Sequence, residues 1–565
     1  MLNGETLNGT EMNGGAGPAV APGPDPEYVV AGISYLWRDR VVVNGVDVSD
    51  QLVGGLDYDR EEGAAGVAGF GIYLPPGPVV PSDWVGLSVT IDYITTTEGV
   101  TTEERRFTGV IASPPDWNSE LRVLNCECSD SLQQRVEAMP QGEIDTLTGG
   151  MWSEDLFEPI AGRSHWDYAL ERMSTRTASL DCSALGVPRV TNWYAKTTPD
   201  FVFGPGTTID QSVKVEPAGL VGRTNRIELE VSFRYSRLWQ RNQSYSWLHP
   251  ETDGTEGIPG FCNWRGYPSE LPTITMIDEA TADTGQTVIN PLYYLLPPTT
   301  PNPCGDGVPW INRFDDLLLG VDWTGARRWV QTITETYRMV LATTAGVGTT
   351  SRIVQRNGYS VEVENTAAEA WEAGPNTDLN DESRRGSLVE ASQRIALAEI
   401  VAAHRETTVS WQVPTSMALG IDLTHTLELN DQGVRARGKC RRISGSHDPD
   451  TGLAITTLSI AVMRGGGVSD ALTVPARLGL DEDPGAGGDG IPTILPTQIS
   501  GFGLPDYDPD LDGFSGNSDA GGGPSQFPRD MVIPADEISE IARDERVLTG
   551  DYLYRVGIPN DLLEL

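Results

Sequence analysis

Alternation of apolar and polar residues with a period of two dominates this chain and predicts a protein built mainly from β-strands. In residues 226–236 the odd positions from 227 to 235 are apolar and the even positions are polar. That alternation is typical of a long strand with one buried face. The same pattern recurs in residues 85–93, 409–413 and 458–462. We therefore expect several half-buried strands distributed over the whole chain.

Turn residues separate the predicted strands at two places. Asn44-Gly45 stands between two short apolar runs, and this dipeptide readily adopts the positive φ angles of a two-residue hairpin. The sequence His-Asp-Pro-Asp-Thr-Gly at 447–452 predicts a second strand connection. Both places are expected to join antiparallel strands.

Helices are expected to be few. The clearest covers residues 387–405, where Ser387 and Glu390 fit a capping box and an apolar stripe follows. Shorter helices are predicted over residues 166–173 and 309–319.

The fold class expected is mainly β with minor α, in several domains, as a length of 565 residues also favours. Residues 470–520 hold ten carboxylates and one basic residue, Arg477, among many glycines and prolines, which is typical of a linker. The predicted order is a flexible leader (1–27), a first β domain (28–135), a small α+β domain (136–214), a second β domain in two parts (215–250 and 325–465), a loop insertion (251–324), an acidic Gly/Pro-rich linker (466–526) and a C-terminal tail (527–565) whose apolar residues could order on a partner.

The N-terminal segment has neither a basic stretch nor an apolar core, so we do not interpret it as a secretion signal. No run of 18 apolar residues occurs, so we expect no membrane insertion.

The charge balance is strongly acidic, with 80 Asp and Glu against 40 Lys and Arg, a formal net charge of −40. Binding to nucleic acid depends on cations that displace the counterions of the phosphates. An anionic membrane surface likewise attracts basic segments. The composition therefore argues against a protein that grips DNA or docks on such a membrane.

The motifs of common enzymes are absent from the sequence. It has no phosphate-binding loop with its lysine, no H-E-x-x-H and no G-x-S-x-G, and its five histidines are scattered. The six cysteines form no C-x2-C pair, and we expect small buried thiols in a reducing cytosol. We predict no catalytic residues and no cofactor.

One segment near the C-terminus has the spacing of a calcium-binding loop. Asp508, Asp510, Asp512 and Asp519 occupy positions 1, 3, 5 and 12, and Gly513 occupies position 6. Hard cations such as Ca²⁺ take oxygen ligands at this spacing. However, position 12 is Asp where Glu is usual, and no helix pattern flanks the loop. The alternative is a chance match in an Asp/Gly-rich tail.

Several stretches together resemble the baseplate-hub, or tail-tip hub, proteins of tailed bacteriophages. VVVNGVDVSDQLVGGLDYDREEGAAGVAGFGIYLPPG (41–77), RRFTGVIASPP (105–115) and LRVLNCECSDSLQQRVE (121–137) look like their first tube-type domain. GRSHWDYALERM (162–173) is similar to the helix that opens their second domain. The long strands at 227–247 and 326–339, and the blocks at 391–414 and 433–462, look like a second tube-type domain.

This resemblance implies a non-enzymatic structural protein of the virion, made of two tube-type β-barrel or β-sandwich domains, a small α+β domain and a loop insertion. It also implies a homotrimer, assembled in the host cytoplasm, that adapts six-fold to three-fold symmetry. The trimer would cap a distal tail or tail-tube protein above and carry a central spike or fibre below. Genomic DNA would pass through it without specific binding during ejection, and acidic walls would repel the phosphates. The alternative reason for the acidic composition is solubility.

Two other functions stay open. The insertion contains Phe261, Trp264, Tyr267, Tyr293 and Tyr294, which could form the binding loop of a tail-tip receptor-binding adhesin or pack between domains. A tail-associated cell-wall hydrolase is the third possibility, against which the lack of a signal sequence and of a hydrolase constellation weighs.

Overall fold

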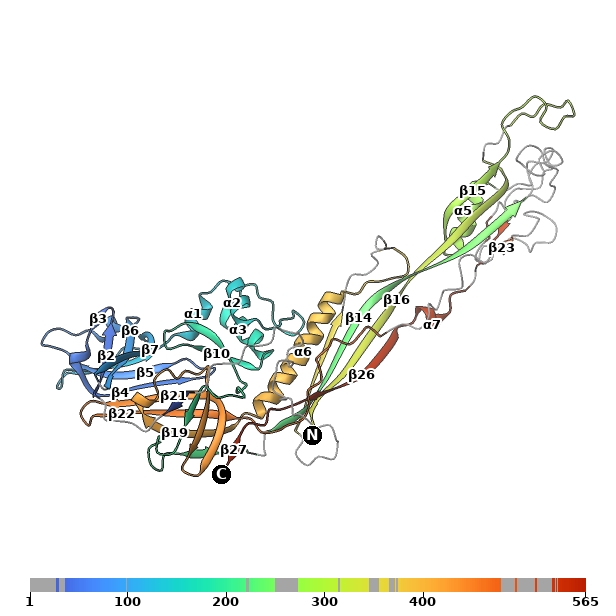
Figure 1. The fold of residues 1–565 in the computed structure, drawn as a ribbon. Helices are drawn as coiled ribbons and strands as arrows, with labels where there is room; N and C mark the ends of the chain where they lie inside the picture. The colour runs from blue at the N-terminus through green and yellow to red at the C-terminus, as the bar shows by residue number, and fades with distance from the viewer. Residues whose placement is uncertain are drawn as a thin grey trace, which may run out of the picture.

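The molecule consists of a β-rich head and a long arm that extends away from it (Figure 1). The computed structural model describes residues 27–29, 36–97, 99–219, 223–248, 273–312, 316–344, 355–364, 371, 374–478, 493–494, 514–515, 531–533, 535 and 537–565. Strands are the main regular element in this part of the chain, as the alternation predicts.

The head contains two groups of strands, which we call the first half and the second half. The first half comprises β2 (Leu36–Val43), β3 (Val46–Asp47), β4 (Leu52–Glu61), β5 (Val67–Tyr73), β6 (Ser88–Thr97), β7 (Val100–Ile111), β8 (Asp116–Asn118) and β9 (Val123–Ser129). The second half comprises β12 (Phe201–Phe203), β13 (Lys214–Glu216), β19 (Thr407–Pro414), β20 (Thr426–Asp431), β21 (Val434–Asp448) and β22 (Leu453–Val462), and β1 (Glu27–Val29) and β27 (Leu563–Glu564) are added to it.

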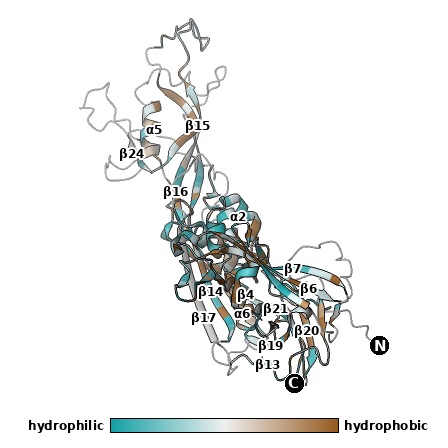
Figure 2. Ribbon diagram, turned by 90° about the vertical axis from the view of Figure 1, so that its left-hand side faces the viewer, coloured by the Kyte–Doolittle hydropathy of each residue, from teal (hydrophilic) through white to brown (hydrophobic). Residues whose placement is uncertain are grey.

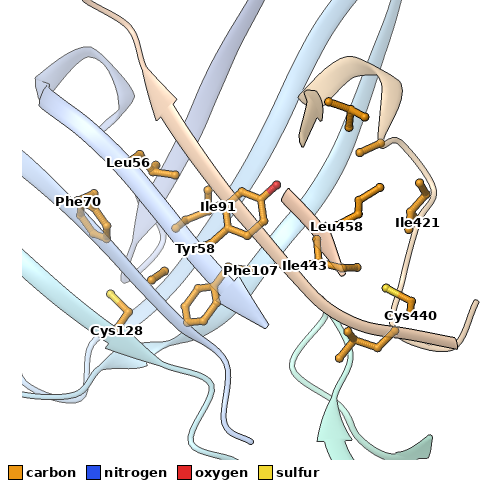
Figure 3. Packing of buried hydrophobic residues seen from close by; sticks show 14 of the residues in the cluster. Leu56, Tyr58, Phe70, Ile91, Phe107, Cys128, Ile421, Cys440, Ile443 and Leu458 are labelled. Atoms are coloured by element: carbon orange, nitrogen blue, oxygen red, sulfur yellow. The ribbon is translucent and has the colours of Figure 1, made fainter. Parts of the chain in front are cut away.

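The two halves form one continuous sheet. Strand β21 pairs antiparallel with β4, from Arg442 opposite Glu61 to His447 opposite Leu56. Their buried residues form one hydrophobic cluster, in which Tyr58 lies between residues of both halves (Figure 3). Both predicted turns are present: Asn44 and Gly45 have φ angles of 48° and 79° and link β2 to β3, and residues 449–452 link β21 to β22.

A small α+β unit packs beside the head. It contains α1 (Leu132–Glu137), α2 (Gln141–Thr148), α3 (His165–Ser174), β10 (Ala178–Cys182) and β11 (Pro188–Asn192) around a core of its own. Helix α3 confirms the helix predicted over residues 166–173. Its first turn is capped by Ser164, whose hydroxyl accepts a hydrogen bond from the Asp167 amide.

The arm is a long hairpin of β14 (Thr224–Leu248) and β16 (Leu318–Thr343), whose strands pair from Arg226–Ala342 to Leu248–Gly320. A strand of this length spans about 80 Å. Hydrophobic and hydrophilic residues alternate along it (Figure 2), and the odd side chains of β14 from Ile227 to Tyr235 are buried, as predicted.

Further elements flank the part of the arm nearest the head. These are β17 (Gln355–Glu364), β18 (Thr377–Asp378), α6 (Glu382–Ala403), α7 (Glu540–Arg543) and β26 (Arg546–Val556). Helix α6 packs against β14 and β16. None of the helices that the structure describes has the length and apolar character needed to cross a bilayer.

The far end of the arm, which we call the arm tip, has its own core. Helix α5 (Ile274–Asp283) and strand β15 (Thr287–Leu295) pack there on the ends of β14 and β16. The short strands β23 (Thr493–Ile494), β24 (Phe514–Ser515) and β25 (Met531–Val532) belong to the same region. The insertion predicted as a loop therefore contains a helix and a strand, and β16 already begins within it, at Leu318.

The strand partners differ from the predicted grouping. Residues 215–250 and 325–465 were expected to form one β domain, but β14 and β16 form the arm sheet, whereas β19 to β22 join the first half. The alternation in β14 indicates which face is buried but not what covers it, and α6 covers it here. The assignment of two tube-type domains remains a proposal.

Two helix predictions need correction. Helix α6 begins at Glu382, because Asp381 caps it and accepts a 2.9 Å hydrogen bond from the Arg384 amide, while Ser387 lies inside the helix. The helix predicted over residues 309–319 is wrong in the described part of that stretch. There Trp310 bridges to Thr300, and the apolar residues that begin at Leu317 run into β16 and the tip core.

The described C-terminal residues pack on their own chain, and a partner for residues 527–565 remains a prediction. Strand β26 pairs in parallel with β16 and buries Tyr554 and Val556. The end of the chain then returns to the head, where β27 pairs with β21. The segment just before residue 479 also packs on the arm. Its single basic residue, Arg477, hydrogen-bonds to the buried Glu335 (3.2 Å) and to Asp378 (2.8 Å).

The cysteines follow the prediction in four cases and not in a fifth. Cys126, Cys128, Cys182 and Cys440 are free and buried, and burial raises the pKa of Cys126 to about 12. Cys304, in the arm tip, is disulfide-bonded, so its assignment as an isolated thiol was wrong.

We predict that Phe233→Asp destabilises the arm, because Phe233 is only 5% exposed and its ring lies edge-on to Tyr337 with centroids 6.4 Å apart. A charge placed there has no partner, and the loss in unfolding free energy should be at least about 3 kcal/mol. The control is Glu230→Gln on the opposite face, where the exposed pair with Arg338 contributes at most about 1 kcal/mol. Limited proteolysis should cleave the arm of the first variant and spare the second. Equal resistance in both would contradict the assigned burial.

Candidate functional site: the open face of the joined sheet

One face of the joined sheet is polar and belongs to both halves; we call it the open face. Pairing across β21 and β4 places Asp59 beside Ser444, and Ser444 beside Thr457. Neighbouring rows contain Asp57 with Ser446 and Glu61 with Arg442. Because side chains alternate between the faces of a strand, the residues between these positions point into the core.

The two halves contribute different chemistry to the open face. The first half supplies carboxylates at Asp57, Asp59, Glu61 and Glu127. The second half supplies hydroxyl and amide groups together with Arg442, at the positions Ser410, Gln412, Arg442, Ser444, Ser446, Thr457 and Ser459. At its edge, β13 adds Lys214 and Glu216, which pair with Ser410 and Thr408. We call the pairing of β4 with β21 the joint. The open face is therefore acidic on the first-half side of the joint and uncharged but polar on most of the second-half side.

The arginine of this face is engaged with a carboxylate. Arg442 Nε donates hydrogen bonds to both oxygens of Asp59, at 2.8 and 3.1 Å. This bond raises the pKa of Arg442 above its ordinary value. A guanidinium paired across two strands is less available to an incoming phosphate than a free one, and the pair also ties β4 to β21.

The joint itself depends on the lack of a side chain at Gly445. This residue pairs with Tyr58, and a Cβ at Gly445 would lie 2.2 Å from the Tyr58 ring. The Tyr58 hydroxyl lies 3.3 Å from Thr456 Oγ1 on β22. Tyr58 thus reaches from the first half into the second across the glycine.

A group of charged side chains locks the α+β unit to both halves. Asp422 precedes β20 and forms ion pairs with Arg60 of β4 and Arg189 of β11, and Arg189 also bonds to the buried Asp181 at 2.9 Å. Burial opposes ionisation of Asp422, but the bonds and charges of Arg189 and Arg60 outweigh it and hold its pKa well below the usual range. Removing one member of such a group leaves buried charge unpaired, which is costly.

A buried histidine near the joint has the neighbours of a catalytic triad. His447 Nδ1 lies 2.8 Å from Asp39 Oδ1, and His447 Nε2 lies 3.1 Å from Thr415 Oγ1. Catalysis by such a set requires a hydroxyl that a substrate can reach. The Thr415 and His447 side chains are fully buried, and the rings of Trp37, Tyr58 and Tyr93 surround the imidazole. The arrangement therefore ties β2, β21 and the segment after β19 together as a packed polar group.

The calcium candidates Asp508, Asp510, Asp512 and Asp519 lie outside the described residues. Within the described residues, no group of three or more His, Cys, Asp or Glu side chains could hold a metal ion. Calcium binding by the acidic segment remains a prediction.

Sequence reasoning did not find the open face. In residues 56–61 carboxylates alternate with other side chains, at Asp57, Asp59 and Glu61. This alternation indicates a strand with one polar face. The partner strand lies more than 380 residues later in the chain, at Arg442. No local pattern indicates that pairing.

Solved structures of phage and prophage tail proteins are among those similar to this chain. They include the tail protein from Neisseria meningitidis MC58 (11% identity, TM-score 0.36, 75% of this chain and 96% of the other covered), the 43 kDa tail protein of prophage MuSo2 from Shewanella oneidensis (10%, 0.34, 75% and 96%) and a prophage tail protein from Listeria monocytogenes EGD-e (7%, 0.30, 75% and 94%). No protein-family model and no curated protein matches the chain. At these identities and TM-scores, function has to be argued from the chain's own residues.

We predict that Gly445→Ala weakens the joint, because the new methyl group would overlap the Tyr58 ring. Overpacking of this kind costs about 1–3 kcal/mol. The control is Gly69→Ala on β5, where the nearest atom to an added Cβ, the Cys126 carbonyl oxygen, is 3.9 Å away. Urea unfolding followed by near-ultraviolet circular dichroism should show a lower midpoint for Gly445→Ala alone. Equal midpoints for the two variants would show that Tyr58 does not depend on the glycine.

Proposed function

We propose that this chain is a structural hub protein of a bacteriophage tail tip or baseplate, and that three copies form a ring whose open faces line a channel for DNA. The observation that carries the proposal is the hydrogen-bonded joint between the two halves of the head. It places two β-rich units side by side in one chain, with one polar face in common.

Symmetry explains why two joined halves suit such a role. A tail tube with six-fold symmetry can be continued by three chains only if each chain supplies two comparable units. Three copies of the head would place six halves around one axis, and contacts between chains would be head-to-tail. The strand path of the described head ends at β1 on one side and at β2 with β3 on the other, and a branch through β22 and β19 ends at β13. Each copy therefore has different strand edges to bring together.

The charge of the open face suits a conduit for DNA. Cationic walls would bind phosphates and slow passage, because each contact releases counterions and gains free energy. The open face carries the four carboxylates of the first half and Glu216 against Arg442 and Lys214, and Arg442 is held by Asp59. The net charge of −40 adds to the repulsion.

The position proposed for the trimer follows the resemblance of the sequence to tail-tip hubs. A distal tail or tail-tube protein would lie above the ring and a central spike or fibre below it. The protein would be a virion component without enzymatic activity or cofactor, assembled in the host cytoplasm. The hydrolase alternative gains no support from the triad-like group, since Thr415 is buried. The receptor-binding alternative is favoured by a hollow on the surface of the arm tip.

The mass of the assembly tests this proposal. Native mass spectrometry should give about three times 61.0 kDa, alone or after addition of the tail-tube protein. Gly445→Ala serves as a variant with a weakened joint and should populate the trimer less, whereas Gly69→Ala should match the wild type. A protein that stays monomeric in the presence of its tail-tube partner would rule out the hub.

A further inference from the structure

The arm tip is built as a separate module at the end of the arm farthest from the head (Figure 1). Its core centres on the stacked rings of Tyr245 and Trp323, 5.0 Å apart, beneath helix α5. The tip also contains the disulfide-bonded Cys304, whereas the described cysteines of the head and the α+β unit are free. Disulfides persist mainly in oxidising surroundings, so this bond suits a module that works outside the cell.

An open hollow of about 260 Å³ lies on the tip sheet, between β14, β15 and β16. Side chains alternate along these strands. Tyr245 and Trp323 therefore point to the core, and Ser244, Ser246 and Asp322 to the face opposite α5. A bulge in β15 shapes one wall: the register shifts between Ile289 and Leu292.

The residue that forms the bulge is Asn290, whose φ angle is 51°. Asparagine tolerates this left-handed conformation better than most side chains. The bulge leaves Leu292 54% exposed beside the hollow. The amide of Asn290 and the apolar side chain of Leu292 therefore line the same wall of the hollow.

The polar groups of the hollow centre on one carboxylate. Asp322 Oδ1 accepts a 2.6 Å hydrogen bond from Ser246 Oγ, and Oδ2 accepts a 3.2 Å bond from Tyr294 Oη. Each carboxylate oxygen has a second lone pair that can accept another hydroxyl. Ser244 and Asn290 add further donors and acceptors at the edge.

We propose that this hollow binds a neutral saccharide, so that the arm tip acts as a glycan-binding site in addition to the role of the head. A sugar ring presents adjacent hydroxyls, each both a donor and an acceptor, and these match a carboxylate flanked by hydroxyl and amide groups. Its C–H face can pack on Leu292. The volume lies below the roughly 300–1,000 Å³ of sites for larger ligands, which suits one or two sugar units.

The charge of the site selects against acidic glycans. Asp322 is the charged residue among those that line the hollow, and the chain as a whole carries −40. A sialylated or phosphate-bearing polymer would place an anion beside this carboxylate. A neutral glycan meets no such repulsion.

The test uses the labelled full-length protein on an array of neutral glycans built from hexoses and N-acetylhexosamines, with sialylated and phosphorylated glycans on the same array. We expect binding to a neutral class. Asp322→Asn and Asn290→Gly should each weaken it at least about tenfold, as the loss of a hydrogen bond that involves a charged or well-placed group implies. Glycine keeps the left-handed backbone at position 290, so the second variant removes the amide without disturbing the bulge.

The matched control is Asp551→Asn on β26, the same chemical change on an exposed part of the arm outside the hollow, which should bind like the wild type. Binding of no neutral glycan, equal binding by all variants, or binding only to a protein receptor would overturn the proposal. The trimer mass, measured on the same samples, reports on the hub separately, because the tip variants leave the head intact.

Discussion

The hydrogen-bonded pairing of β21 with β4 is the constraint on which the rest of the head depends. An exposed strand edge is a template for pairing with other chains, and here each half covers an edge of the other. The pairing fixes register as well: a slip by one residue would turn Asp57 and Asp59 into the core and bring Tyr58 to the surface. Gly445, opposite Tyr58, therefore allows both the close approach of the strands and the polar character of the open face.

The arm depends on a second constraint, the covering of one face of a very long hairpin. Two strands alone are not stable in water, so β14 and β16 need a layer on their apolar side. Helix α6 and the segment around Leu472 and Val474 supply it, and β26 covers the free edge of β16. The same C-terminal segment returns to the head, where the Met463 amide donates to the Asp561 carboxylate at 2.9 Å. The head, the arm and the end of the chain are thus connected by direct contacts.

The sequence predicts local structure well and partners poorly, for a physical reason. The alternation around Phe233 correctly gives a strand and its buried face, and Asn44-Gly45 correctly gives a hairpin, because both depend on neighbours in the chain. The covering of β14 by α6 and the pairing of Arg442 with Asp59 depend on residues more than 100 positions away. The helix predicted over 309–319 fails because the apolar run starting at Leu317 fits a buried strand equally well.

The candidate site was accessible to sequence reasoning only in part. The acidic composition and the resemblance to tail-tip hubs suggested a conduit, but the residues of the open face became visible only with the register of β4 and β21. The triad-like group around His447 could not be recognised from the sequence either, because Asp39 lies 408 positions away from His447. The burial of Thr415 shows that the group is structural. The hollow at the arm tip depends on a bulge at Asn290-Pro291, a dipeptide that indicates a break but does not show that a strand continues on both sides of it.

An electron-microscopy reconstruction of the purified protein would show whether three copies form a ring lined by the open faces. We expect a three-fold ring with a central pore, in which Asp57, Glu61 and Ser446 face the pore and the arms extend away from it. A ring whose pore is lined by another surface, or a particle without a pore, would contradict this expectation.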